Sequence, residues 1–173
     1  MTKRQARIET GRLVLTGITD KDRQEFIGIF LNEEIKKTYM IPDGLSERQL
    51  DGYLEAFKKY SKPDGGHIVF GIFRDDVLIG FINETGINDD EIEIGYVIHP
   101  DHQGNGYCTE AVKAAICELF RIGFRKVSAG YFEGNVKSRR VMEKCGMTES
   151  GRIEYIRYMG ENKKTIIREI TAL

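Results

Sequence analysis

A short segment that contains two glycines, with a carboxylate upstream, is the part of this sequence best suited to chemistry. Gln103-Gly104-Asn105-Gly106 follows a strand-like pattern and leads into a long apolar helix pattern. Such a junction gathers free backbone N–H groups at the positive end of a helix dipole, which favours a phosphate or pyrophosphate. Small residues at Gly104, Gly106 and Cys108 let the backbone approach that anion without obstruction by Cβ atoms. With Glu93 as a potential base beside it, the loop could help move a group off a phosphorylated carrier.

The elements that must position these residues follow an irregular order. Two pairs, Thr19 with Asp22 and Ser46 with Gln49, have the spacing of helix-starting capping boxes. Further helices are expected from Asn105 or Tyr107 to about Ile122 and over 135–145. Strands are expected over 12–16, 67–73, 77–83, 91–98, 126–131, 148–158 and 165–173, the last two joined through 160–162.

This order predicts an α/β fold of the α+β type. We expect a mixed, mostly antiparallel central sheet of about seven strands, with helices on both of its faces. The length of 173 residues suits a single domain over 1–173.

Composition narrows the class of protein. Lys plus Arg total 26 and Asp plus Glu total 27, so the charge balance gives no electrostatic footprint for nucleic acid. Three cysteines without C-x-x-C spacing argue against a disulfide framework and against a thiolate metal site, so no metal is expected. The sequence has neither a signal-peptide pattern nor an apolar run near the ~18 residues of a membrane span. A cytoplasmic protein that does not bind membranes is therefore expected.

The sequence resembles the GNAT superfamily of acetyl-CoA-dependent N-acyltransferases. The phosphate motif of that superfamily, Gln/Arg-x-x-Gly-x-Gly/Ala, is matched at Gln103 and Gly106, with Cys108 at the last small position. Within the superfamily the chain is similar to the ribosomal-protein N-terminal acetyltransferase branch, the RimJ/RimL type. The segments that carry this similarity are Glu9–Leu15, Ile94–Tyr96, Gly106–Ala111, Asn135–Ser138 and Glu143–Met147. Thr16 departs from the arginine that is common at its position.

The resemblance implies a GNAT-like acyl-CoA N-acyltransferase fold with acetyl-CoA as co-substrate. It assigns the loop to the pyrophosphate and implies that the strand before it splays from the next one, so that its main chain pairs with the pantetheine arm. The implied cofactor-binding residues are Val97, Ile98, Gln103, Gly104, Asn105, Gly106, Tyr107, Cys108, Thr109 and Asn135. The simpler interpretation is a turn that binds nothing. A dinucleotide fold is disfavoured because Thr109 replaces the third glycine of its fingerprint.

Two residues are candidates for catalysis. Strand alternation over 91–98 separates Glu93 from the apolar set that ends at Ile98. Glu93 would deprotonate an amine directly or through water, with Glu91 and Glu84 as the alternative bases and a surface ion pair as the simpler interpretation. The resemblance places Ser138 near the thioester sulfur, where its hydroxyl would protonate the leaving thiolate.

Two further interpretations concern residues around the loop. Asn135 is also a good helix N-cap, whatever else it contacts. The cysteines Cys108, Cys117 and Cys145 are best explained as small packing residues. A route through an acyl-cysteine stays open because His99 and His102 flank the loop.

The expected function is transfer of an acetyl group from acetyl-CoA to a primary amine by direct attack in a ternary complex. The resemblance suggests a protein N-terminal amine as acceptor, and small amines such as polyamines, aminoglycosides or amino acids are the alternative. A non-catalytic acyl-CoA sensor or scaffold is the alternative of another class. The segment from Glu33 to Lys62 and the turn after Tyr158 are expected to shape the acceptor end. Tyr155, Tyr158 and Met159 either line this end or form a core stripe, and the sequence leaves both interpretations open. The sequence leaves monomer and homodimer open.

Overall fold

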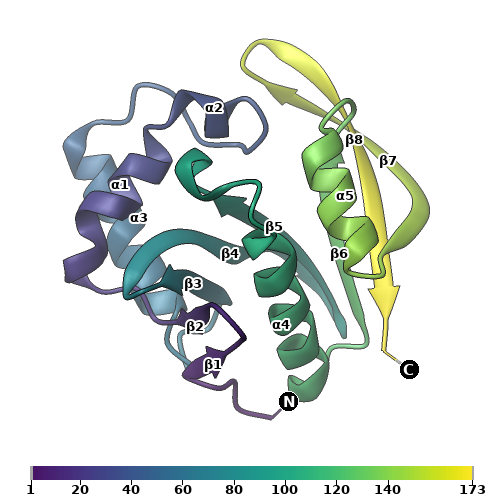
Figure 1. The fold of residues 1–173 in the computed structure, drawn as a ribbon. Helices are drawn as coiled ribbons and strands as arrows, with labels where there is room; N and C mark the ends of the chain where they lie inside the picture. Colours follow the sequence, from purple (N-terminus) through teal and green to yellow (C-terminus); the bar gives the residue numbers. More distant parts are fainter. Residues whose placement is uncertain (1, 173) are drawn as a thin grey trace.

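The computed structural model describes residues 2–172, which form one eight-stranded sheet flanked by helices (Figure 1). The strands run in the order β1-β2-β3-β4-β5-β6-β8-β7, and every neighbouring pair is antiparallel except β5 with β6. The strands are β1 Arg7–Glu9, β2 Val14–Thr16, β3 Val69–Arg74, β4 Val77–Asn88, β5 Glu91–Ile98, β6 Lys126–Phe132, β7 Thr148–Tyr158 and β8 Glu161–Thr171. The helices are α1 Arg23–Phe30, α2 Glu33–Lys36, α3 Glu47–Tyr60, α4 Tyr107–Ile122 and α5 Val136–Lys144.

The expected architecture is confirmed, with local corrections at both ends of the chain. The unexpected strand β1 pairs with β2, where Ile8 faces Leu15, and this adds an edge strand to the expected sheet. The expected loop over 160–162 is wrong, because β8 already pairs with β7 at Tyr158 and Glu161. Met159 and Gly160 both have positive φ, which makes a two-residue hairpin turn possible and lets the strands pair at once.

Two apolar cores, one on each face of the sheet, hold the helices in place. The core under α4 and α5 contains the buried side chains of Ile92, Ile94 and Ile98 from β5. The other core packs α1 to α3 against Phe81 and Val97. Strand alternation therefore divides β5 between two layers, as its sequence pattern predicts. The two groups of helices stand apart in Figure 1.

Local sequence signals set the boundaries of helices on both faces of the sheet. Both α4 boundaries fall at glycines, Gly106 and Gly123, whose left-handed φ values of 80° and 118° end the regular helix on either side. Ser46 and Gln49 form the expected capping box at the start of α3. Within residues 2–172, no helix is long and apolar enough to cross a membrane.

Candidate active site

The sheet opens between β5 and β6, its parallel pair. These strands pair only at Glu91–Lys126, Ile92–Val127 and Glu93–Ser128, and then diverge (Figure 1). Beyond this point β6 keeps its partner β8 as far as Phe132. A cleft of about 1090 Å³ occupies the opening. Its walls come from β5, β6, β7, the loop before α4, helix α5 and the segment around α2. The divergence agrees with the splayed strand that the family resemblance implies.

The main chain of β5 faces the opening at alternate residues. A Cβ atom on Gly80 of β4 would lie 2.1 Å from the Val97 carbonyl oxygen, so that carbonyl points toward β4. Because main-chain groups alternate along a strand, those of Tyr96 and Ile98 point toward the cleft. The Ile98 carbonyl accepts a hydrogen bond from Gln103 Nε2 at 2.9 Å. The geometry thus favours Tyr96 and the Ile98 N–H over Val97 as the main-chain partners of a ligand.

The loop before α4 forms an open backbone cradle. Gly104 and Gly106 both have φ of 80°, a conformation that side chains strain. A Cβ atom on Gly104 would meet no heavy atom within 4 Å, so the space above the loop is free. The N–H groups at the start of the 16-residue helix α4 border that space. The cradle and cleft fit the pyrophosphate and extended arm of an acyl-CoA.

Most of the predicted cofactor-binding residues line this cleft: Val97, Ile98, Gln103, Gly104, Gly106, Tyr107, Cys108, Thr109 and Asn135. Asn105 differs, because its side chain folds back and donates to the carbonyls of His102 and Gln103 at 3.2 and 3.0 Å. These hydrogen bonds stabilise the conformation of the loop and direct the Asn105 side chain to the loop itself. The Asn105 carbonyl accepts from Arg12 Nη1 at 2.9 Å.

A carboxylate on α4 ties the loop to the N-terminal segment. Glu110 accepts hydrogen bonds from Thr10 Oγ1 at 2.6 Å and from Arg12 Nε at 2.8 Å. Burial alone would raise the pKa of Glu110, but these bonds and the Arg12 charge outweigh it and hold the pKa below its usual range. The Arg12 guanidinium also lies over the Tyr107 ring, 4.7 Å from its centroid. No local sequence signal predicts this tether, although the segments Glu9–Leu15 and Gly106–Ala111 that form it both carry the family resemblance.

Glu93 alone among the three candidate bases lines the cleft. Glu84 is 3.0 Å from His67 Nδ1 and accepts from the Ile68 N–H at 3.1 Å. Glu91 forms an ion pair with Lys126 at 2.7 Å. Both alternatives are thus engaged away from the cleft.

The Glu93 carboxylate is itself held on both oxygens. Arg152 on β7 donates to its Oε2, and Thr85 Oγ1 lies 3.3 Å from its Oε1. Arg152 also pairs with Glu154 at 3.2 Å, and Glu154 lines the cleft beside Glu93. The ion pair that the simpler interpretation describes is therefore present, although Glu93 also lines the cleft. Neither Arg152 nor Glu154 has a local sequence signal that brings it to Glu93.

The Ser138 hydroxyl pairs with the hydroxyl of Tyr96, whose position in the strand pattern groups it with the apolar side chains of β5. Ser138 Oγ and the Tyr96 hydroxyl are 2.9 Å apart, and both residues line the cleft. Burial raises the pKa of Tyr96, so its hydroxyl stays protonated at neutral pH. Asn135 is the expected N-cap, and its Oδ1 accepts from the Ser138 N–H at 3.2 Å.

Two of the three cysteines lie in surroundings that suppress their reactivity. Cys108 is half-buried at the cleft wall, and burial raises the pKa of its thiol. Cys145 is buried, which raises its pKa to about 11. Because the thiolate is the nucleophile, these shifts disfavour a route through an acyl-cysteine. Cys117 is exposed and does not line the cleft.

The segment around α2 closes the other end of the cleft. Tyr39 lies over Gly95, where a Cβ atom would come within 3.1 Å of its ring, and donates to Asn83 Oδ1. Tyr158 on β7 fixes this segment, because its hydroxyl lies 2.8 Å from the Lys36 carbonyl. Tyr155 fits neither of its two interpretations, because it is 72% exposed on the outer side, and Glu154 and Ile156 line the cleft instead. Strand alternation explains this difference. Met159, for which the same two interpretations were open, lies in the exposed hairpin turn.

The profile of the acetyltransferase (GNAT) domain matches residues 12–148 of the chain. The chain belongs to the GNAT acetyltransferase family. The chain is therefore an acyl-CoA-dependent N-acetyltransferase. The uncharacterized N-acetyltransferase YoaA of Bacillus subtilis (strain 168) is 31% identical to it over 160 residues, covering 90% of this chain and 89% of YoaA.

Solved GNAT structures share the same fold over nearly the whole chain. The ribosomal L7/L12 α-N-protein acetyltransferase RimL matches with a TM-score of 0.83 at 15% identity, covering 96% of this chain and 94% of RimL. The microcin C7 self-immunity acetyltransferase MccE, solved with acetyl-CoA and AMP, matches with a TM-score of 0.81 at 18% identity, covering 94% of each chain. The GNAT fold is thus confirmed.

Proposed function

We propose that this GNAT enzyme transfers the acetyl group of acetyl-CoA to a protein N-terminal amine by direct attack within a ternary complex. The observation that carries the proposal is the opening between β5 and β6, which ends at the Gly104–Gly106 cradle. It offers an anion site at one end and unpaired strand edges along its length. The acceptor class rests on the five segments that resemble the RimJ/RimL branch.

The residues at the loop and on β5 bind and orient acetyl-CoA. N–H groups at the start of α4 hold the pyrophosphate, and Gln103 keeps the loop against Ile98. The main-chain groups of Tyr96 and Ile98 pair with the pantetheine arm, as a neighbouring strand would. When bound, acetyl-CoA supplies a thioester carbonyl that is open to attack by an amine.

Glu93 is the proposed base for the acceptor ammonium. Both of its oxygens are engaged by Arg152 and Thr85, so it takes the proton through a water molecule rather than by direct contact. Arg152 keeps the carboxylate turned toward the cleft. Acetyl transfer to the neutral amine then forms the amide.

The paired hydroxyls of Tyr96 and Ser138 are the proposed proton source for the leaving thiolate. Burial raises the pKa of Tyr96, so its hydroxyl still carries its proton when the C–S bond breaks. Tyr96 replenishes Ser138 across the 2.9 Å contact, so the two hydroxyls act as one donor.

Acceptor-dependent release of free thiol from acetyl-CoA tests the proposal. The panel consists of peptides that begin with Ala, Ser or Met, together with polyamines, aminoglycosides and amino acids. We expect turnover with a peptide and a matching mass shift at its N-terminus. Turnover with a small amine alone would show that the acceptor is a small molecule and not a protein N-terminus. CoA binding without turnover on any acceptor would favour a sensor, and absence of CoA binding would overturn the proposed site.

Replacement of the base tests its role separately. Glu93→Gln keeps the size of the side chain and should lower kcat by about 100-fold while flattening its pH profile. Glu91→Gln, outside the cleft on the same strand, is the matched control and should retain activity. Full activity of Glu93→Gln would remove this residue from the role.

A further inference from the structure

The two faces of α5 carry different charges. Lys137, Arg140 and Lys144 recur at intervals of three and four residues and line the cleft, so they share one helix face. The acidic residue of the helix, Glu143, does not line the cleft and lies 3.6 Å from Arg139. The helix thus presents only positive charge to the cleft.

The three cations of this face have no acidic partner. Within residues 2–172, no carboxylate lies within the 4.0 Å ion-pair distance of Lys137, Arg140 or Lys144, and all three side chains are exposed. The chain is otherwise balanced, with 26 basic and 27 acidic residues. Like charges three and four residues apart on a helix repel each other. A bound anion would relieve this repulsion.

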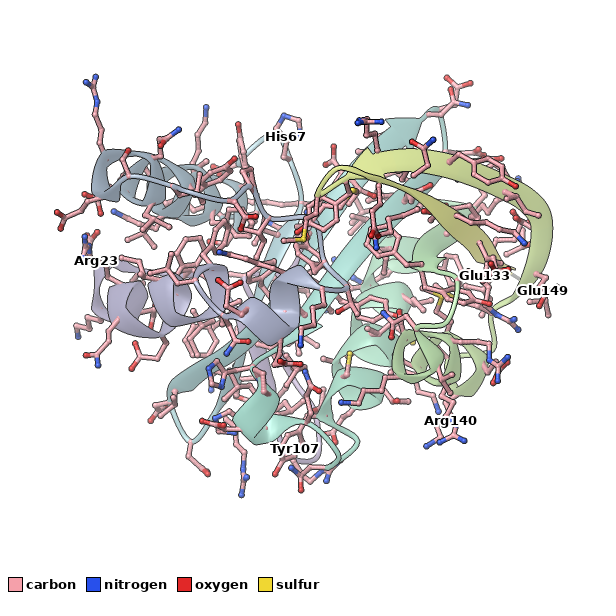
Figure 2. The ribbon with its side chains drawn as sticks, turned by 90° about the horizontal axis from the view of Figure 1, so that it is seen from above. Arg23, His67, Tyr107, Glu133, Arg140 and Glu149 are labelled. Atoms are coloured by element: carbon pink, nitrogen blue, oxygen red, sulfur yellow. The ribbon has the colours of Figure 1, made fainter. Side chains whose placement is uncertain are left out.

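The length of the positive face exceeds the reach of one phosphate group. Lys137 to Lys144 spans seven residues, which corresponds to about 10 Å of helix rise. Lys137 donates to Gln103 Oε1 at 3.1 Å and so belongs to the loop end. Arg140 lies one turn further along, and Figure 2 shows its side chain projecting from α5 into open space, away from Glu149. An anion at the loop therefore leaves Arg140 and Lys144 free for a second one.

We propose that Arg140 and Lys144 bind the 3′-phosphate on the adenosine of CoA, an inference that rests on the proposed function. CoA carries a pyrophosphate and, on its ribose, a separate phosphate, which matches two anion sites along one wall. The planar guanidinium of Arg140 suits two phosphate oxygens, and Lys144 adds a mobile point charge. These residues would make the enzyme select CoA over its 3′-dephospho form.

Calorimetric titration with CoA and with 3′-dephospho-CoA tests the assignment on the intact protein. The wild type should bind 3′-dephospho-CoA about 10-fold more weakly, as expected for a charge-assisted contact at an exposed site. Arg140→Gln and Lys144→Gln should each weaken CoA binding and leave 3′-dephospho-CoA binding unchanged. Arg139→Gln, the adjacent cation outside the cleft, is the control and should change neither.

The titrations distinguish failure of this inference from failure of the proposed function. Equal affinity of the wild type for the two ligands would overturn the 3′-phosphate site while leaving the acyl-CoA cleft intact. Equal weakening of both ligands in Arg140→Gln would assign this arginine to the pyrophosphate. Absence of binding by either ligand would overturn both proposals. The comparison in the wild type needs no substitution, so it does not depend on the folding of a variant.

Discussion

At the residue scale, the contact between Tyr96 and Ser138 gives the clearest chemical hypothesis. Tyr96→Phe removes the hydroxyl that replenishes Ser138 and leaves the ring in place. We expect kcat to fall about 10-fold, because a thiolate leaves readily and needs only modest help from an acid. The affinity for CoA should change little, because the main chain of residue 96 is unaltered.

Steady-state kinetics and CoA titration of Tyr96→Phe and Ser138→Ala test this pair. If the hydroxyls act as one donor, the double variant should be hardly slower than the slower single variant. Multiplicative losses would show that they act separately. Unchanged kcat in both single variants would exclude them as the acid.

Cys108 provides a second test at this scale. Burial raises the pKa of its thiol, so Cys108→Ala should retain most of the activity and only alter packing at the loop. Mass spectrometry of the wild type after incubation with acetyl-CoA alone should show no acetylated Cys108. A stable acetyl adduct on this residue would revive the two-step route.

At the scale of elements, the tether between Arg12 and α4 should govern the shape of the loop. Arg12→Ala removes its bonds to Glu110 and to the Asn105 carbonyl. We expect weaker CoA binding and a loss of about 1 kcal/mol in unfolding free energy, because solvent screens this half-exposed pair. Arg7→Ala, which breaks only the exposed pair with Glu9, should affect neither quantity. Equal effects of the two substitutions would mean that the tether is not specific to the loop.

The hairpin of β7 and β8 should act on the acceptor rather than on the cofactor. Tyr158→Phe removes the hydroxyl that lies 2.8, 3.2 and 3.1 Å from the carbonyls of Lys36, Tyr39 and Ile41. The loosened segment should raise KM for the acceptor and leave the Kd of CoA unchanged. Hydrogen exchange over residues 36–41 should accelerate in the same variant. A rise in the Kd of CoA with an unchanged KM for the acceptor would show that Tyr158 acts on cofactor binding and not on the acceptor.

Local signals predict the elements much better than the contacts between them. The boundaries of α4 were predictable because Gly106 and Gly123 end a regular pattern at positive φ. Strand β1 was not, since three residues carry too short an alternation to be recognised. The contact of Arg152 with Glu93 spans 59 residues, and that of Tyr96 with Ser138 spans 42. Such pairs depend on the final sheet order, which the residues themselves do not encode locally.

At the scale of the whole molecule, carboxylates that are held by hydrogen bonds and arginines should set the stability in acid. The pKa values of Glu110 and Glu118 both lie below the usual glutamate value of 4.5; burial opposes this shift, and hydrogen bonds and nearby arginines outweigh it. A lowered folded-state pKa contributes stability that is complete above the unfolded value and is lost as the pH falls through the folded value. The free energy of unfolding should therefore decline from about pH 5 downward.

Urea unfolding between pH 7 and pH 3 measures this decline. Glu118→Gln should reduce stability at pH 7 and flatten the pH dependence, because the ionised partner of Arg121 is gone. Glu47→Gln, at a carboxylate whose side chain is 84% exposed, is the control and should follow the wild-type curve. A wild-type slope preserved in Glu118→Gln would assign the acid sensitivity to other groups.

The brief parallel pairing of β5 with β6 also has a mechanical consequence. Five strands lie on one side of this junction and three on the other, and only three residue pairs join them within the sheet. A sheet resists bending through continuous rows of hydrogen bonds, so its stiffness is lowest here. The two parts of the sheet are joined by strand pairing at one end of the junction and are separated at the other. A ligand bound along the open end would contact both parts of the sheet and set the angle between them.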